Sequence, residues 1–278
     1  MPHTIYVAHS PDSDDAFMFY ALSEGLIDTG DIRYVHELQD IETLNQRALR
    51  GELEVTAVSM HAYSYITDRY ALLPHGASMG DRYGPRLVAR EPTAREALRG
   101  RRIAIPGSLT TAALVLRMYQ PDFVAIATPF DQIEDAVASG DVDAGLLIHE
   151  GQLTYMDRGL HLIADMGEWW HEETALPLPL GGNVIRKDLG LPLIKTISQH
   201  LRASIAHGLA NRPKALDHAM RFARGLSRTK ADEFVGMYVN EWTLDYGERG
   251  RIAVRTLLQK GMEAGLIDRE VTVEFVDG

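Results

Sequence analysis

The chain has 278 residues, of which 45% are hydrophobic, and 28 basic against 39 acidic residues give it a formal net charge of -11. This excess of acid repels nucleic-acid phosphates and anionic membrane surfaces, so neither is an expected partner. The absence of cysteine excludes disulfides, thiolate nucleophiles and cysteine metal sites. Near the N-terminus we find neither a signal peptide nor a membrane span, and we expect a cytoplasmic globular protein.

The first predicted strand covers residues 4–10 and leads directly into the acidic turn SPDSDDAF. Asp and Ser are favoured N-cap residues, and acid suits the positive end of a helix dipole. One cap explains only one aspartate, so we expect Ser13 or Asp14 to cap the following helix and Asp15 to face a ligand. A capped helix with solvated neighbours is the alternative. A calcium loop is disfavoured because Ala16 stands where a further oxygen ligand is needed.

Three further strand-like runs, at residues 54–59, 101–107 and 143–150, are each followed by a polar loop and a helical pattern. This alternation predicts an α/β fold with a mainly parallel sheet. Ligands of such sheets bind beyond the carboxyl ends of the strands, so the four loops are expected to form one site. Ser59, at the end of the second run, is a candidate for that site.

Thr110 and Thr111 open the helix that follows the third run. Their hydroxyls, together with backbone N–H groups at the helix N-terminus, could hold a carboxylate or a phosphate. Ordinary helix capping is the alternative. A P-loop is excluded because the lysine is missing and the glycine spacing is wrong.

His149 ends the fourth run, where its side chain would project into a cleft. Imidazole can take up and return protons near neutral pH, so His149 is the candidate general base. A hydrogen-bonded structural histidine is the alternative. Neither an HExxH motif nor another paired His–carboxylate spacing occurs, which argues against a zinc enzyme.

Two segments rich in glycine and proline interrupt the pattern of strands and helices: Gly84-Pro85 and the run PLPLGG at residues 177–182. They indicate where the chain could cross between two lobes. The amphipathic patterns after residue 188 are typical of helices that pack on the first lobe. A second lobe would then be inserted into the first, with the cleft between them. The expected division is residues 1–89 with 181–278 in the first lobe and residues 90–180 in the second.

Several longer segments occur in order from about Tyr6 to beyond Gly250, among them SPDSDDAFMFYAL, PGSLTTAALVL, AGLLIHEGQLTY and EWWHEETALPLPLGGNVIRKDLG. Together they resemble the 1,4-dihydroxy-6-naphthoate synthases of the futalosine route to menaquinone, and IHEGQLTY and LPLPLG are the most specific segments. The resemblance implies a fold like the type II periplasmic binding proteins, with two α/β lobes around a ligand cleft. It also implies a cytoplasmic, cofactor-free lyase that acts on cyclic dehypoxanthine futalosine.

The resemblance also implies roles for individual residues: His149 is the base, and the substrate-binding residues are Asp15, Ser59, Thr110 and Thr111. Members of that family often read SPCPNDTF where this chain reads SPDSDDAF, which adds the charge of Asp14 beside a substrate that carries a carboxylate. Chorismate dehydratase, which shares the fold and the pathway, and a solute-binding protein without chemistry are the alternatives. The sequence leaves the oligomeric state open.

Overall fold

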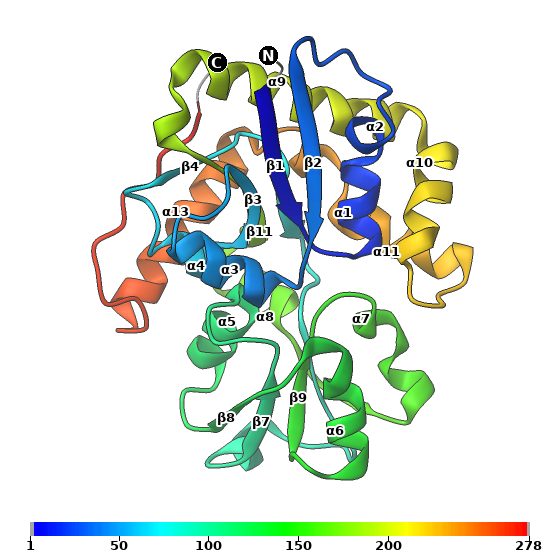
Figure 1. Ribbon diagram of the computed structural model, residues 1–278. Helices are drawn as coiled ribbons and strands as arrows, with labels where there is room; N and C mark the ends of the chain where they lie inside the picture. The colour runs from blue at the N-terminus through cyan, green and yellow to red at the C-terminus, as the bar shows by residue number, and fades with distance from the viewer. Residues whose placement is uncertain (1–2, 277–278) are drawn as a thin grey trace.

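The computed structural model describes residues 3–276 and contains two β-sheets, one above the other in the view of Figure 1. The first sheet has the strand order β2-β1-β3-β11-β4, with β5 also paired to β11. β1 runs parallel to β2 and β3, whereas β11 runs antiparallel to β3, β4 and β5. The strands are β1 (His3–His9), β2 (Ile32–Leu38), β3 (Val55–Ser59), β4 (Tyr70–Leu72), β5 (Ser78–Gly80) and β11 (Leu178–Arg186).

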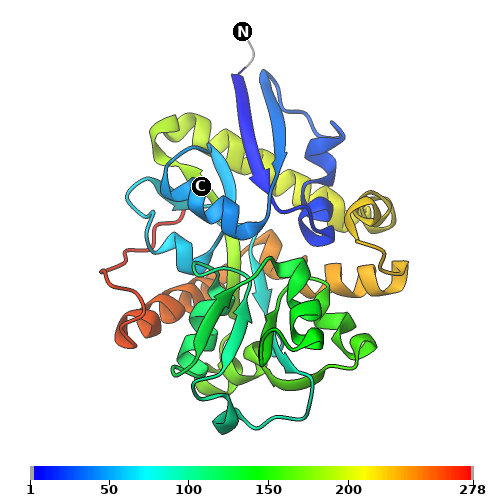
Figure 2. The same cartoon turned by 60° about the horizontal axis from the view of Figure 1, so that its bottom comes forward.

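The second sheet has the order β10-β6-β9-β7-β8. β7 runs parallel to β8 and β9, and β6 runs antiparallel to β9 and β10. In Figure 2 the first sheet lies in the upper part of the molecule and the second in the lower part, and the chain passes between them near the middle. The strands are β6 (Arg86–Ala89), β7 (Arg102–Ile105), β8 (Val124–Ala127), β9 (Ala144–Leu147) and β10 (His161–Asp165).

The chain crosses between the sheets twice, from β5 to β6 and from β10 to β11. Both sheets are therefore mixed rather than mainly parallel as expected, because β6 and β11 arrive from the other sheet and need no crossover helix to join their neighbours. Pairing places residues 86–89 in the second sheet and residues 178–180 in the first. The expected lobe boundaries lie a few residues away from these crossings, and the division into lobes stays a prediction.

The two crossing segments touch at Gly84 and Gly167. A Cβ atom on Gly167 would lie 1.9 Å from the carbonyl oxygen of Tyr83, so no larger residue fits there without a shift of the backbone. The N–H of Met166 also donates a hydrogen bond of 2.9 Å to the carbonyl of Pro85. The crossings thus pack backbone against backbone.

The helices surround both sheets, and the longest of those described, α9 (Leu191–Ala210), runs across the top of the first sheet in Figure 1. It contains the amphipathic pattern expected after residue 188. Around the second sheet lie α5 (Thr111–Tyr119), α6 (Ile133–Ser139), α7 (Gly151–Thr154) and α8 (Met166–Thr174). The others are α1 (Ser13–Met18), α2 (Tyr20–Ser23), α3 (Ile41–Leu49), α4 (Met60–Tyr63), α9 (Leu191–Ala210), α10 (Arg212–Ala219), α11 (Arg228–Tyr238), α12 (Glu241–Leu244) and α13 (Gly247–Glu263).

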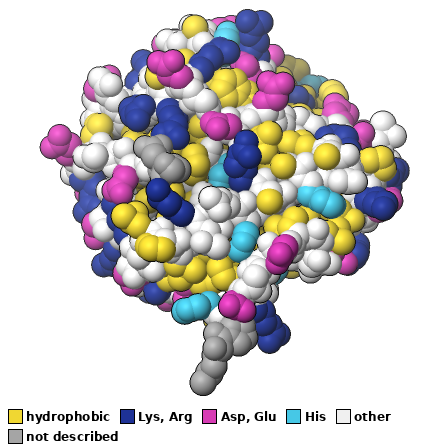
Figure 3. Space-filling model, turned by 90° about the horizontal axis from the view of Figure 1, so that it is seen from above, with side chains coloured by type: hydrophobic (Ala, Val, Ile, Leu, Met, Phe, Trp, Pro, Cys, Tyr) yellow, Lys and Arg dark blue, Asp and Glu magenta, His cyan; other side chains and the backbone are white. Residues whose placement is uncertain are grey.

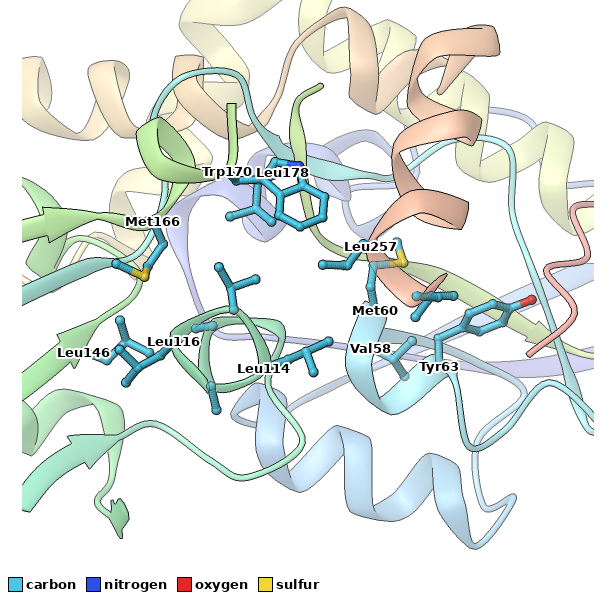
Figure 4. Packing of buried hydrophobic residues seen from close by; sticks show 14 of the residues in the cluster. Val58, Met60, Tyr63, Leu114, Leu116, Leu146, Met166, Trp170, Leu178 and Leu257 are labelled. Carbon is cyan, nitrogen blue, oxygen red and sulfur yellow. The ribbon is translucent and has the colours of Figure 1, made fainter. Parts of the chain in front are cut away.

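The largest hydrophobic cluster spans both sheets. Figure 4 shows the leucines of α5 between Leu146 and Met166, from the second sheet's side, and Val58 and Met60, from the first. Trp170 on α8 is fully buried in the same cluster, and its indole N–H donates to the carbonyl of Pro177 at 3.1 Å. Apolar burial of this kind supplies most of the free energy that holds such layers together.

In the face seen from above in Figure 3, basic and acidic side chains are interspersed, and neither gathers into a continuous patch. Among the helices of residues 3–276, none is long and apolar enough to cross a membrane.

Candidate active site

A cleft with an empty volume of about 740 Å³, part of it open to solvent, contains all five residues expected from the sequence. They come from both halves of the molecule, and each lies at or after the carboxyl end of β1, β3, β7 or β9. The five are Asp15, Ser59, Thr110, Thr111 and His149.

The acidic turn after β1 differs from the expected capping arrangement. The N-cap position of α1 is Asp12, not Ser13 or Asp14, and the Asp12 side chain makes no capping hydrogen bond. Its backbone carbonyl accepts from the N–H of Ala16 at 2.9 Å. The expectation that Ser13 or Asp14 caps the helix was wrong, because the helix already begins at Ser13. The carboxylate at the N-cap position does not cap either, because it faces charged partners from elsewhere in the chain.

One of those partners is His149. Its Nδ1 lies 2.8 Å from Oδ2 of Asp12, and the two side chains are 14% and 1% exposed. The ring edge of Phe130 packs against the imidazole, with centroids 4.5 Å apart. Within the described chain, Nε2 of His149 has no hydrogen-bond partner although it is buried. The cleft therefore contains an imidazole that is held on one nitrogen and free on the other.

The second partner of Asp12 is Arg224, in the loop after α10. Its Nη2 lies 2.6 Å from Oδ1 of Asp12, and its Nη1 lies 3.4 Å from Oε2 of Glu150. Glu150 also accepts from the hydroxyl of Ser13 at 3.1 Å. His149 and Arg224 both have left-handed backbones, with φ of 58° and 46°. Such values are uncommon outside glycine and often accompany functional sites.

The charges of this group shift the pKa values of its members. Burial alone would lower the pKa of His149, but the carboxylates of Asp12, Glu150 and Asp14 raise it to about 9. Burial alone would raise the pKa of Asp12, but His149 and Arg224 lower it to about 2. At neutral pH the pair is therefore an imidazolium beside a carboxylate.

The other two acids of the turn have raised pKa values. Burial, together with the charges of Asp15 and Asp12, raises the pKa of Asp14 well above its usual range. Burial raises the pKa of Asp15 to about 6, against two hydrogen bonds of 2.7 Å that its Oδ2 accepts from the N–H and hydroxyl of Ser10. Asp14 lines the cleft, and its Oδ1 is buried without a hydrogen-bond partner in the described chain.

Ser59 is fixed by Asn45 on α3. The Asn45 side chain accepts from the N–H of Ser59 at 2.9 Å and donates to its hydroxyl at 3.2 Å. Sequence reasoning did not identify Asn45, because an amide inside a helix gives no signal of a partner fourteen residues away.

The hydroxyls of Thr110 and Thr111 are already used within the protein. Thr110 caps α5 by accepting from the N–H of Ala113 at 3.2 Å, so the capping interpretation holds for its side chain. Thr111 donates to the carbonyl of Leu180 at 2.6 Å. In the loop before α5, the N–H of Leu109 donates to Oε2 of Glu42 at 3.2 Å, so a carboxylate of the protein occupies a donor expected for a ligand.

Over residues 3–276, the structure has no group of three or more His, Asp or Glu side chains arranged to hold a metal ion. The side chains that line the cleft can transfer protons and form hydrogen bonds. His149 can exchange a proton through Nε2, and the surrounding carboxyl, hydroxyl and amide groups can orient a polar substrate.

The fold and the position of this cleft define the class of protein. An alkanesulfonate-binding protein of Xanthomonas axonopodis pv. citri has a TM-score of 0.72, with 12% identity over 98% of this chain and 96% of its own. A Candida albicans protein described as having the generic periplasmic binding protein fold has a TM-score of 0.66, with 15% identity over 99% and 98% of the two chains. The chain thus has a periplasmic-binding-protein-like α/β fold with two lobes.

A family model described as menaquinone biosynthesis matches residues 5–263, and the chain belongs to that family. It is 42% identical to a 1,4-dihydroxy-6-naphthoate synthase of Thermus thermophilus over 92% of this chain and 93% of that protein. The corresponding protein of Streptomyces coelicolor is 39% identical over 95% of both chains. The crystal structure of an Archaeoglobus fulgidus protein is also similar, with a TM-score of 0.90 and 47% identity over 95% of this chain and 98% of that one.

Proposed function

We propose that this protein is a 1,4-dihydroxy-6-naphthoate synthase: a cytoplasmic lyase that converts cyclic dehypoxanthine futalosine to 1,4-dihydroxy-6-naphthoate without an added cofactor. The observation that carries the proposal is His149, whose buried Nε2 has no hydrogen-bond partner in the described chain and whose side chain lines the cleft. In its neutral form, an imidazole with a free Nε2 can act as a general base.

In this proposal the neutral imidazole of His149 takes a proton from the substrate as the carbon–carbon bond breaks and the ring becomes aromatic. A general base typically contributes about 10² to 10⁴ in rate. Asp15 and Ser59 hydrogen-bond the polar groups of the substrate, and the N-terminus of α5 attracts its carboxylate. Closure of the two lobes would exclude water and align these groups.

The first experiment incubates the purified protein with cyclic dehypoxanthine futalosine and follows the products by chromatography and mass spectrometry. Formation of 1,4-dihydroxy-6-naphthoate would support the proposal. Unchanged substrate in the presence of folded protein would contradict it. The same assay with chorismate would then test the dehydratase, and ligand recovered unchanged after saturable binding would indicate a solute-binding protein.

The second experiment tests the base. The variant His149→Gln keeps a polar side chain but cannot accept the proton, so it should lose activity by about 10² to 10⁴ while keeping the fold. His161→Gln is the matched control, because His161 is an exposed histidine on β10. A His149→Gln enzyme with wild-type turnover would remove His149 from the mechanism.

A further inference from the structure

The contact between Asp12 and His149 joins the two halves of the molecule. Asp12 follows β1 of the first sheet, and His149 follows β9 of the second. Their side chains meet at 2.8 Å, although the two residues are 137 positions apart in the chain. The geometry of the candidate base therefore depends on how the halves come together.

We propose that Asp12 is a positioning residue for His149: its carboxylate, fixed by Arg224, holds Nδ1 of the imidazole and directs Nε2 into the cleft. This inference rests on the proposed role of His149 as the base. It adds a residue outside the expected set, on the opposite side of the cleft from the imidazole that it orients.

The argument begins with the two nitrogens of the ring. A carboxylate beside Nδ1 favours the tautomer with a proton on Nδ1, so the lone pair of the neutral ring is on Nε2. Nε2 is the nitrogen that has no partner in the described residues. Asp12 therefore determines which nitrogen can accept a proton from the substrate.

The position of the carboxylate is itself fixed. Asp12 is 1% exposed, and Oδ1 contacts Arg224 at 2.6 Å while Oδ2 faces His149. The guanidinium also lies over the ring of Phe130, 4.4 Å from its centroid, and Phe130 packs on His149. Arg224 thus supports both the carboxylate and the aromatic ring that contact the imidazole.

Asp12 is one of several charged groups near His149. Asp14 and Asp15 lie on α1, Glu150 follows His149 in the chain, and Arg224 comes from the loop after α10. Among the causes that raise the pKa of His149, Asp12 makes the largest contribution, through its charge and its contact of 2.8 Å with Nδ1. Removal of the Asp12 carboxylate should consequently lower the pKa of His149 more than removal of any other single carboxylate.

The test is Asp12→Asn, which keeps the shape of the side chain and removes its charge. NMR titration of the His149 ring, without substrate, should show a midpoint at least one pH unit below that of the wild type. The pH profile of kcat/KM should shift in the same direction, because this ratio reports ionisation of the free enzyme. Asp12→Glu, which keeps the charge but displaces it, should restore the high midpoint and leave turnover low.

Asp135→Asn is the matched control, since it removes one carboxylate from an exposed pair with Arg158 and should leave the His149 midpoint unchanged. If Asp12→Asn fails to fold, the smaller neutral Asp12→Ser takes its place with the same expected shift. A wild-type midpoint in a folded neutral variant would overturn the inference. If the midpoint shifts as expected but the wild-type protein does not convert the futalosine substrate, the result would support the role of Asp12 in holding His149 and contradict the proposed function.

Discussion

The hydroxyl of Thr111 donates a hydrogen bond of 2.6 Å to the carbonyl oxygen of Leu180, and it also accepts from the N–H of His61 at 3.2 Å. Thr111 is the first residue of α5, on the side of the second sheet, whereas Leu180 lies on β11 of the first. One buried hydroxyl thus satisfies two backbone groups of the other half of the molecule.

Thr111→Val should therefore destabilise the protein by about 1–3 kcal/mol, because a side chain of similar shape leaves buried backbone groups unpaired. The free energy of unfolding is measured in urea. Thr111→Ser keeps the hydroxyl and should lose much less. Equal stability of the Val and Ser variants would show that the hydrogen bonds contribute nothing.

The pH dependence of kcat/KM should reflect the raised pKa of His149. With a pKa of about 9, roughly one-hundredth of the imidazole is neutral at pH 7, and a base acts only in its neutral form. The rate should rise with pH from 7, reach half of its maximum near pH 9 and level off above that pH. A rate that falls over this range would mean that the protonated ring is the active form.

His9 and His36 should make the protein sensitive to acid. Nε2 of His9 lies 3.1 Å from Nδ1 of His36, and burial lowers the pKa of each from 6.5 to about 4. Between pH 6.5 and 4 the unfolded chain binds more protons, so stability is fully present above pH 6.5 and is lost as the pH falls to about 4.

The variant His36→Gln, which carries no charge in this range, isolates the contribution of one of these groups. Its loss of unfolding free energy between pH 7 and 4.5 should be about 1–3 kcal/mol smaller than that of the wild type. Urea unfolding at constant ionic strength measures the difference. Parallel losses in the two proteins would assign the acid sensitivity to other groups.

Glu42 should compete with an anionic substrate at the N-terminus of α5, because its carboxylate already accepts from the N–H of Leu109. Glu42→Gln removes that charge and should lower KM by about two- to fivefold, which corresponds to ~0.3–1 kcal/mol of charge–dipole interaction. Glu263→Gln, at the exposed end of α13, is the control. An unchanged KM would place the substrate carboxylate elsewhere.

Much of the fold could be predicted from the sequence. Strands β1, β3, β7 and β9 were identifiable because each is an apolar run before a polar loop, and the resemblance to the menaquinone biosynthesis family is confirmed. β2 gave no such signal. It is an edge strand, so its residues IRYVHEL are mostly half-exposed and mix charged with apolar side chains.

In the candidate site, only the residues that lie at or after strand ends were predictable from the sequence. That rule brings His149 and Asp15 to the same cleft, as the structure has them. It does not give the contact of Asp12 with His149, because that contact depends on how two different sheets are placed relative to each other. Arg224 was not identifiable either, since it lies in a loop after α10 that has no strand before it.

The hydrophobic cluster around Trp170 has a consequence for the thermodynamics of the chain. Its buried members come from both sheets, so removal of either sheet would expose apolar side chains of the other to water. We expect both halves to unfold in one cooperative transition, with equal calorimetric and van't Hoff enthalpies. The molecule has two sheets by topology but should unfold as one unit, and we expect that neither half folds when expressed alone.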